Sequence, residues 1–241
     1  DDPGKSAQCR RHVADAVEAA QELVSAWIKE GASRLSLGLV DGHFGTAKTS
    51  FLSPLMAKFG TGGMYFPYTG EPIVTADAPD CRVPFIAIHE LMHQRGVARE
   101  DDANFLAWLA TRGAKDKHLI FRYSANLEML RQCVAALNQI AQQSGGEESP
   151  AFEILKRYFQ KTGDEKRPWE WRAGTLNEGS KADLAAIRKY FDEHKGKLAD
   201  TGRKLNNAYL KANQQEQGVK AYNDVVRLVI AARRQKAQGL P

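Results

Sequence analysis

The spacing of apolar residues predicts that this chain is mostly helical. A first helix is expected over residues 6–30, where one face carries Val13, Val17, Ala20, Val24 and Trp27. Gly31 follows directly and acts as a stop signal. The same kind of spacing predicts further helices over about 84–95, 99–111, 118–143, 150–161, 180–198, 200–213 and 217–237.

Residues 32–80 follow a different pattern, in which glycine and proline alternate with residues that favour strands. The segment GTGGMYFPYTGEPIVTADAPD predicts short strands around 63–68 and 71–76, joined by a turn at Thr69-Gly70. Pro84 and Gly96 then bracket the next helix. The fold class expected is α+β: mostly helical, with a small sheet packed on the helix over 84–95.

The sequence predicts a single domain, residues 1–241, with one candidate linker. The segment QQSGGEESP, residues 142–150, separates a core over about 1–143 from a helical C-terminal part over about 150–241. The sequence contains no internal repeat. The C-terminal helices are expected either to cover a cleft or to bind a partner.

Composition and charge exclude several classes of protein. The chain has 241 residues, 43% hydrophobic and 26% charged, which is ordinary for a globular protein. Its net charge of +5 is scattered along the chain and does not favour nucleic-acid binding. No apolar run approaches the roughly 18–20 residues of a membrane span. Because the sequence begins at Asp1 without a methionine, we expect a processed or truncated start.

Three cysteines are too widely separated for a zinc knuckle or a redox pair. Two interpretations stay open for Cys9, Cys81 and Cys133: buried free thiols, or one disulfide among the three pairings.

The segment IAIHELMHQRGVARE carries the densest chemistry. His89 and His93 lie four residues apart, so on a helix both imidazoles can reach one metal ion. Glu90 lies about 100° round the same helix, which suits a general base better than a ligand. An accidental match is expected in roughly one chain in a hundred of this composition. The apolar flanks argue against an accident, because unpartnered polar groups are costly on a buried helix.

A hydrolytic zinc site needs a third protein ligand. Gly96 permits a sharp turn that brings the next carboxylates back to the histidines. We favour Glu100, with Asp102 as the rival, and expect Asp101 to face solvent. On a helix, Asn104 shares the face of Glu100 and is expected to hydrogen-bond a ligand imidazole.

The sequence also resembles known proteins. Glu100-x-x-Ala103-Asn104 resembles the E-x-x-A-D/N element of HExxH-plus-Glu, gluzincin-like peptidases. The segments YFPYTGEPIVTADAPDCRVPFIAIHELMHQRGVAREDDANFLAWLA and YLKANQQEQGVKAYNDVVRLVIA resemble the DUF3810 family of bacterial putative zinc metallopeptidases. That resemblance implies a zincin-like fold, Zn²⁺ as cofactor, an upstream membrane anchor absent from this chain, and a catalytic part on the extracytoplasmic face of the membrane.

One position departs from a related pattern. The metzincin motif HExxHxxGxxH is matched until its last position, where Arg99 stands in place of histidine. Arginine stays protonated and cannot ligate zinc. A metzincin site is therefore excluded, and the third ligand falls to the carboxylates that follow.

The function expected is a zinc metallopeptidase in which Glu90 activates the attacking water. Tyr123, Tyr68 and Arg122 are candidates to stabilise the oxyanion. The hairpin over about 63–76 is expected either to bind an extended peptide at its edge or simply to pack on the helix.

Several aromatic residues are expected to be structural. His12, His43, His118 and His194 fall outside any ligand spacing. Trp169 and Trp171 are interpreted as a packed anchor, with a substrate-facing pair as the alternative.

Two other functions share these features: a sensor domain of a membrane protein, and a cell-wall amidase using the same site. The partner expected is a peptide or protein substrate, with no nucleic acid.

Overall fold

The computed structural model describes residues 3–30, 39–40, 42, 44–114, 118–161, 171–173, 176–194, 196, 201, 204 and 222–237. Helices dominate this part of the chain and the strands are few, as expected for the α+β class. The helices are α1 (Pro3–Glu30), α2 (Ser53–Lys58), α3 (Val83–Gln94), α4 (Glu100–Thr111), α5 (Leu119–Gln143), the 3-10 turn η3 (Gly146–Glu148), α6 (Pro150–Tyr158), α7 (Glu178–Glu193) and α9 (Tyr222–Ala237). The strands are β1 (Lys48–Thr49), β2 (Gly63–Phe66), β3 (Glu71–Val74), β4 (Phe159–Lys161) and β5 (Trp171–Ala173).

The first sheet has the strand order β1-β3-β2. β1 runs parallel to β3, and β2 runs antiparallel to it, with Gly63 opposite Val74. The predicted hairpin is confirmed, although each strand ends two residues earlier than expected. Gly70 closes the turn with a φ of 70°, a conformation that favours glycine. β1 was not predicted, because two residues are too few to leave a pattern.

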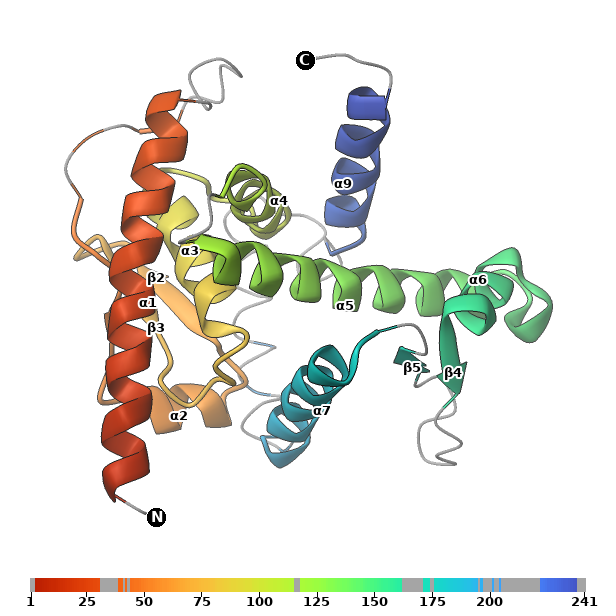
Figure 1. Ribbon diagram of the computed structural model, residues 1–241, viewed down its shortest axis with the longest axis horizontal. Coiled ribbons are helices and arrows are strands. Elements are labelled where there is room, and N and C mark those ends of the chain that lie inside the picture. Colours follow the sequence, from red (N-terminus) through yellow and green to blue (C-terminus); the bar gives the residue numbers. More distant parts are fainter. Residues whose placement is uncertain are drawn as a thin grey trace.

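Helix α3 lies at the centre of the fold, where α1, α4, α5 and strands β2 and β3 surround it (Figure 1). Every residue of α3 is buried except His89 and His93, which are partly exposed. Its first turn is completed from α5: the Ser124 hydroxyl accepts a hydrogen bond from the Phe85 backbone N–H (3.1 Å) and donates one to the Cys81 carbonyl (2.6 Å). The helix is thus fixed at its N-terminal end by its neighbour.

Helix α5 crosses the molecule, with α1 and α3 near one end and α6 near the other (Figure 1). From the C-terminal part of the chain, α9 returns to pack on α4 and α5, and its Val225 and Val229 belong to the same hydrophobic core as α3. The segment 142–150 forms a tight connection through η3, after which Phe152 and Leu155 of α6 pack back against Ala141 of α5.

The C-terminal predictions need correction. A helix was expected over 150–161, but it ends at Tyr158, and residues 159–161 form β4 because they pair with β5. The helix expected over 180–198 is α7, which begins at 178 and ends at 193. The helix expected over 217–237 is α9, described from 222. The helix expected over 200–213 lies outside the described residues, apart from 201 and 204.

A buried ion cluster joins α3, α5 and α7. The Glu128 carboxylate accepts two hydrogen bonds from Arg131 Nη1, at 2.8 and 2.9 Å, and lies 3.4 Å from Arg82 Nε. Both guanidinium groups stand over the ring of Phe191, at 5.0 and 5.1 Å from its centroid. Burial opposes ionisation of Glu128, but the two arginines outweigh it and lower the pKa from 4.5 to about 2.

Replacing Glu128 by glutamine should lower the free energy of unfolding at pH 7 by about 3 kcal/mol, because the buried carboxylate loses its charge and two partly buried guanidinium groups lose their counter-charge. Since the pKa is depressed in the folded state, this stabilisation is complete above pH 4.5 and is lost as the pH falls towards 2. Urea unfolding of the wild type and of Glu128→Gln measures this. The difference between their free energies of unfolding at pH 3 should be less than half of the difference at pH 7.

Glu153→Gln is the matched control. Glu153 forms an exposed pair with Lys156 (3.1 Å), so its loss should change stability little at either pH. A Glu128→Gln effect that is equal at the two pH values would show that the carboxylate acts by packing and not by charge.

Candidate metal centre

The polar residues of α3 lie in two rows along the helix, each made of residues four positions apart, and the two rows (stripes) face different neighbours. His89 and His93 share one stripe, which faces the start of α4. Ile86, Glu90 and Gln94 share the next, which faces the sheet. Gln94 confirms this orientation, since its Nε2 donates to the Gly45 and Gly70 carbonyls, both at 3.1 Å. The spacing of four residues within each stripe is what places these groups together.

Helix α3 ends in a glycine cap that returns the chain to the histidines. Gly96 has a φ of 95°, its N–H bonds the His93 carbonyl (3.0 Å), and the Val97 N–H bonds the Met92 carbonyl (3.1 Å). This is the pattern of a Schellman motif, which favours glycine at that position. The Val97 carbonyl then lies 2.6 Å from His93 Nδ1. In the neutral imidazole, Nδ1 therefore carries the proton and Nε2 keeps its lone pair for a ligand.

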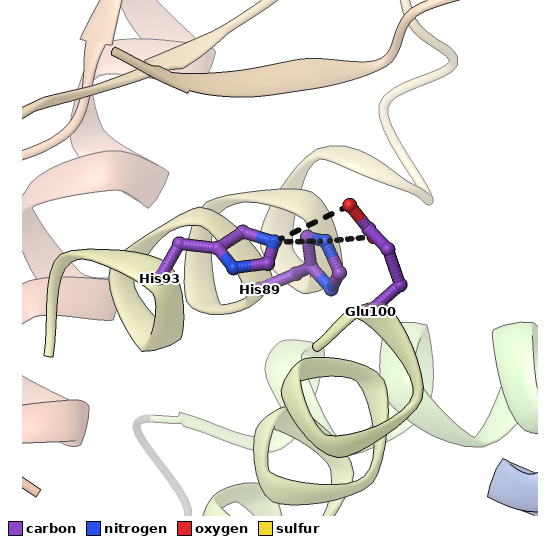
Figure 2. Close-up of side chains that lie close together, drawn as sticks. All are labelled: His89, His93 and Glu100. Carbon is purple, nitrogen blue, oxygen red and sulfur yellow. Dashed lines mark hydrogen bonds and ion pairs between the residues drawn. The ribbon is translucent and has the colours of Figure 1, made fainter. Parts of the chain in front are cut away.

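His89, His93 and Glu100 form one cluster (Figure 2). The two Nε2 atoms lie 3.1 Å apart. His89 Nε2 is 3.2 Å from Glu100 Oε2, and His93 Nε2 is 3.7 Å from Glu100 Oε1. Figure 2 shows both imidazoles projecting from α3 towards the Glu100 side chain at the first residue of α4. In the described part of the chain, this is the group of histidine, cysteine and acidic side chains with the geometry to hold a metal ion.

The rival carboxylates are occupied elsewhere. Arg99 binds Asp101 through Nε (3.1 Å) and Nη2 (2.5 Å), and its Nε lies 3.4 Å from Asp102. Asp101 is only 3% exposed, so the expectation that it faces solvent was wrong: the preceding arginine neutralises it and allows its burial. Because Arg99 draws both aspartates away, Glu100 is the carboxylate left to meet the histidines.

The expected contact of Asn104 is not found. Asn104 is buried in α4, but no hydrogen bond among the described residues joins it to His89 or His93. His89 Nδ1 is buried without a hydrogen-bond partner in this part of the chain.

The cluster is electrostatically coupled. Burial opposes the charged form of Glu100, but hydrogen bonds from His89 and His93 outweigh it and hold the pKa of Glu100 well below its ordinary value. Burial likewise disfavours the imidazolium of His93, whereas the carboxylates of Glu100 and Glu90 favour it and raise its pKa to about 9. The site thus stabilises positive charge at the point where the ligand atoms converge.

Glu90 lies beside this cluster and is 4% exposed. Its burial raises the pKa of the carboxyl group; the charges of His89 and His93 act in the opposite direction, and Glu100 raises it again. The Tyr65 backbone N–H in β2 also favours the ionised carboxylate. A carboxyl group with a raised pKa, next to a cation site, has the properties of a general base.

In the described part of the chain, the contacts of the candidate oxyanion donors are with residues outside the cluster of His89, His93 and Glu100. The Tyr123 hydroxyl donates to Asp183 (2.5 Å) and lies 3.3 Å from the Ser180 hydroxyl, both in α7. Tyr68 is 90% exposed at the β2–β3 turn, with its ring 5.6 Å from that of Phe66. Arg122 is exposed on α5. None of these contacts involves the cluster, and the role of Tyr123 or Tyr68 in catalysis stays a prediction.

The remaining candidates are structural where the structure describes them. His118 is buried, with its ring 5.8 Å from Phe121, and His194 Nδ1 lies 2.7 Å from the Tyr190 carbonyl. Cys81 and Cys133 are free thiols, and burial raises the pKa of Cys81 to about 11, which makes it unreactive. The side chains of Cys9, His12, His43, Trp169 and Trp171 lie outside the described residues.

Sequence reasoning missed Gly63. The strand β2 passes so close to α3 at this residue that a side chain there would meet Glu90. The paired glycines Gly62-Gly63 were the signal available, since glycine in a strand often marks a close approach of another group.

Comparison with known proteins gives one match. A family model described as "Protein of unknown function (DUF3810)" matches residues 5–230. No curated protein and no solved structure matches the chain. The matched segment spans both α3 with its cluster and the C-terminal helices, so this chain belongs to the DUF3810 family.

Proposed function

We propose that this protein is a zinc-dependent hydrolase with a zincin-like fold, and that it cleaves peptide bonds. The observation that carries the proposal is the convergence of His89, His93 and Glu100 at one point with the buried Glu90 beside them. Two imidazoles, one carboxylate and a position left for water are the ligand set of hydrolytic zinc enzymes.

The distances within the cluster fit zinc. Ligand atoms about 2.0–2.1 Å from a tetrahedral zinc ion lie about 3.3 Å from one another. The separations of 3.1, 3.2 and 3.7 Å between Nε2 and carboxylate atoms are close to that value. The carbonyl of Val97, which holds His93 Nδ1 at 2.6 Å, supplies the support that metal-binding imidazoles normally have.

Zinc, when bound by these residues, would act as a Lewis acid and lower the pKa of water in the open position. Glu90 removes the proton from the attacking water and returns it to the leaving amine. Its burial excludes bulk water from that transfer, and its raised pKa brings it nearer to the pH at which it works.

Strand β2 is suited to hold the substrate. It is an edge strand of the described sheet. The hydrogen bond from the Thr75 N–H to the Gly62 carbonyl (2.9 Å) fixes which residues of β2 are hydrogen-bonded to β3. In an antiparallel pair these alternate, so the backbone N–H and C=O groups of Met64 and Phe66 face β3. The N–H and C=O groups of Gly63 and Tyr65 therefore point away from β3, and the Tyr65 N–H faces the Glu90 carboxylate there. An extended peptide that adds to this edge lies alongside Glu90.

The family resemblance supports a location on the extracytoplasmic side of a membrane. None of the described helices is both long and apolar enough to cross a membrane.

Purified protein should bind one zinc ion per chain. His93→Ala and Glu100→Ala each remove a ligand, so each should weaken zinc binding by more than the roughly 10–100-fold that loss of a supporting residue costs. Metal analysis after dialysis against a weak chelator measures this. Asp102→Ala is the matched control, since Asp102 is paired with Arg99 and should retain zinc. Zinc loss in Asp102→Ala with retention in Glu100→Ala would assign the third ligand to Asp102.

Glu90→Gln should lower the turnover of peptide cleavage by about 10²–10⁴-fold while zinc content is unchanged. Glutamine keeps the volume of the side chain and one acceptor oxygen, but it cannot take a proton from water at neutral pH. Zinc content and cleavage of a mixed peptide library are measured on the same preparation. Loss of zinc together with activity would make Glu90 a structural residue, and full activity would place the base elsewhere.

A further inference from the structure

We propose that Gly63 is a positioning residue for Glu90: the absence of a side chain at Gly63 lets β2 lie against the carboxylate and hold it beside the cluster. This inference rests on the proposed function, in which Glu90 is the general base.

The contact is close. A Cβ atom at Gly63 would lie 2.5 Å from Glu90 Oε1, 2.8 Å from Glu90 Cγ and 2.8 Å from Ile86 Cγ2. All three distances are shorter than real contacts of a Cβ atom, so any side chain at this position must move either the carboxylate or the strand. In the native protein the strand backbone thus forms one wall of the space that Glu90 occupies.

The strand is fixed more firmly than the carboxylate. Gly62, next to Gly63, accepts a hydrogen bond from the Thr75 N–H (2.9 Å), and the Thr75 hydroxyl donates to the Ser53 carbonyl (3.1 Å). At the other end of the hairpin, Gln94 of α3 donates to the Gly70 carbonyl. The hairpin is therefore tied at both ends, with Glu90 between them. A side chain at Gly63 displaces the Glu90 carboxylate first, because the end of a side chain can rotate whereas the hairpin backbone is tied at both ends.

The adjacent glycine provides a matched control. A Cβ atom at Gly62 would lie 3.1 Å from Ile86 Cδ1 and 3.7 Å from Ile86 Cγ1, and no atom of Glu90 lies within 4 Å of it. The end of an isoleucine side chain can move by the few tenths of an ångström required. Gly62→Ala therefore makes the same chemical change in the same strand without touching Glu90.

A double-mutant cycle on the full chain tests the contact without substrate. Gly63→Ala should lower the urea midpoint of unfolding, and Glu90→Ala should restore a substantial part of that loss, because the clashing carboxylate is gone. Gly62→Ala and Glu90→Ala should act additively. If Gly63→Ala is too unstable to purify, the contact with Ile86 Cγ2 is removed as well, and Gly63→Ala/Ile86→Ala is compared with Gly63→Ala/Ile86→Ala/Glu90→Ala. Loss of the carboxylate must then raise the urea midpoint.

Kinetics on the zinc-loaded protein test the positioning role. A displacement of about 1 Å costs roughly 10²-fold in rate, so Gly63→Ala should lower kcat by about that factor. KM and zinc content should stay within about twofold of wild type, because alanine keeps the main-chain N–H and C=O groups of residue 63 that line the substrate edge and no ligand is changed. Gly62→Ala should leave kcat, KM and zinc content unchanged.

The outcomes separate this inference from the proposed function. An additive cycle for Gly63 and Glu90, an unchanged kcat in Gly63→Ala, a loss of zinc along with kcat, or a midpoint that Glu90→Ala does not raise in the Gly63→Ala/Ile86→Ala background would each overturn the positioning role. If the wild type binds zinc but cleaves no peptide while the cycle shows coupling, the proposed function fails and the catalytic role of Gly63 fails with it.

Discussion

The burial of α3 is the constraint on which the rest of the structure depends. Ten of its twelve residues are buried, yet it carries two histidines, a glutamate and a glutamine. Polar groups in such a place need partners, because an unpaired buried group costs about as much as a lost hydrogen bond. The partners come from different elements: Val97 and Glu100 for the histidines, the sheet for Glu90 and Gln94, and α5 for the first turn. The fold around α3 thus supplies partners for most of these polar groups, and His89 Nδ1 and Gln94 Oε1 are the atoms of α3 that have none among the described residues.

Charge pairing selects the third member of the cluster. Three carboxylates begin α4, and their positions along the chain give each of them a short path to the histidines. Arg99 removes two of them from contention by binding Asp101 and lying close to Asp102. The residue that stands in the place of the third metzincin histidine therefore pairs with the two carboxylates that do not join the cluster. This explains why a cation beside a proposed cation site does not disturb it: its charge is already neutralised.

The sequence was sufficient for the parts of the site that depend on local spacing. His89, Glu90 and His93 follow from helical periodicity, and Glu100 follows from the turn that Gly96 permits. It was insufficient where a distant partner decides the conformation. Asp101 was expected at the surface because helical periodicity does not show that Arg99, outside the helix, pairs with it. Residues 159–161 have the pattern of a continuing helix, but pairing with β5 makes them a strand. The Gly63 contact depends on the distance between a strand and a helix, which no local pattern records.

The two polar stripes of α3 divide the chemistry between two neighbours. The stripe of His89 and His93 meets α4 at Glu100, and the stripe of Glu90 meets β2 at Gly63. A helical step of about 100° separates the two, so the histidines and the next residue in the chain face different environments. Because β2 lies against Glu90, a change in the hairpin alters the position of the proposed base. The edge strand of the sheet and the position of the proposed base are accordingly set by one element, β2.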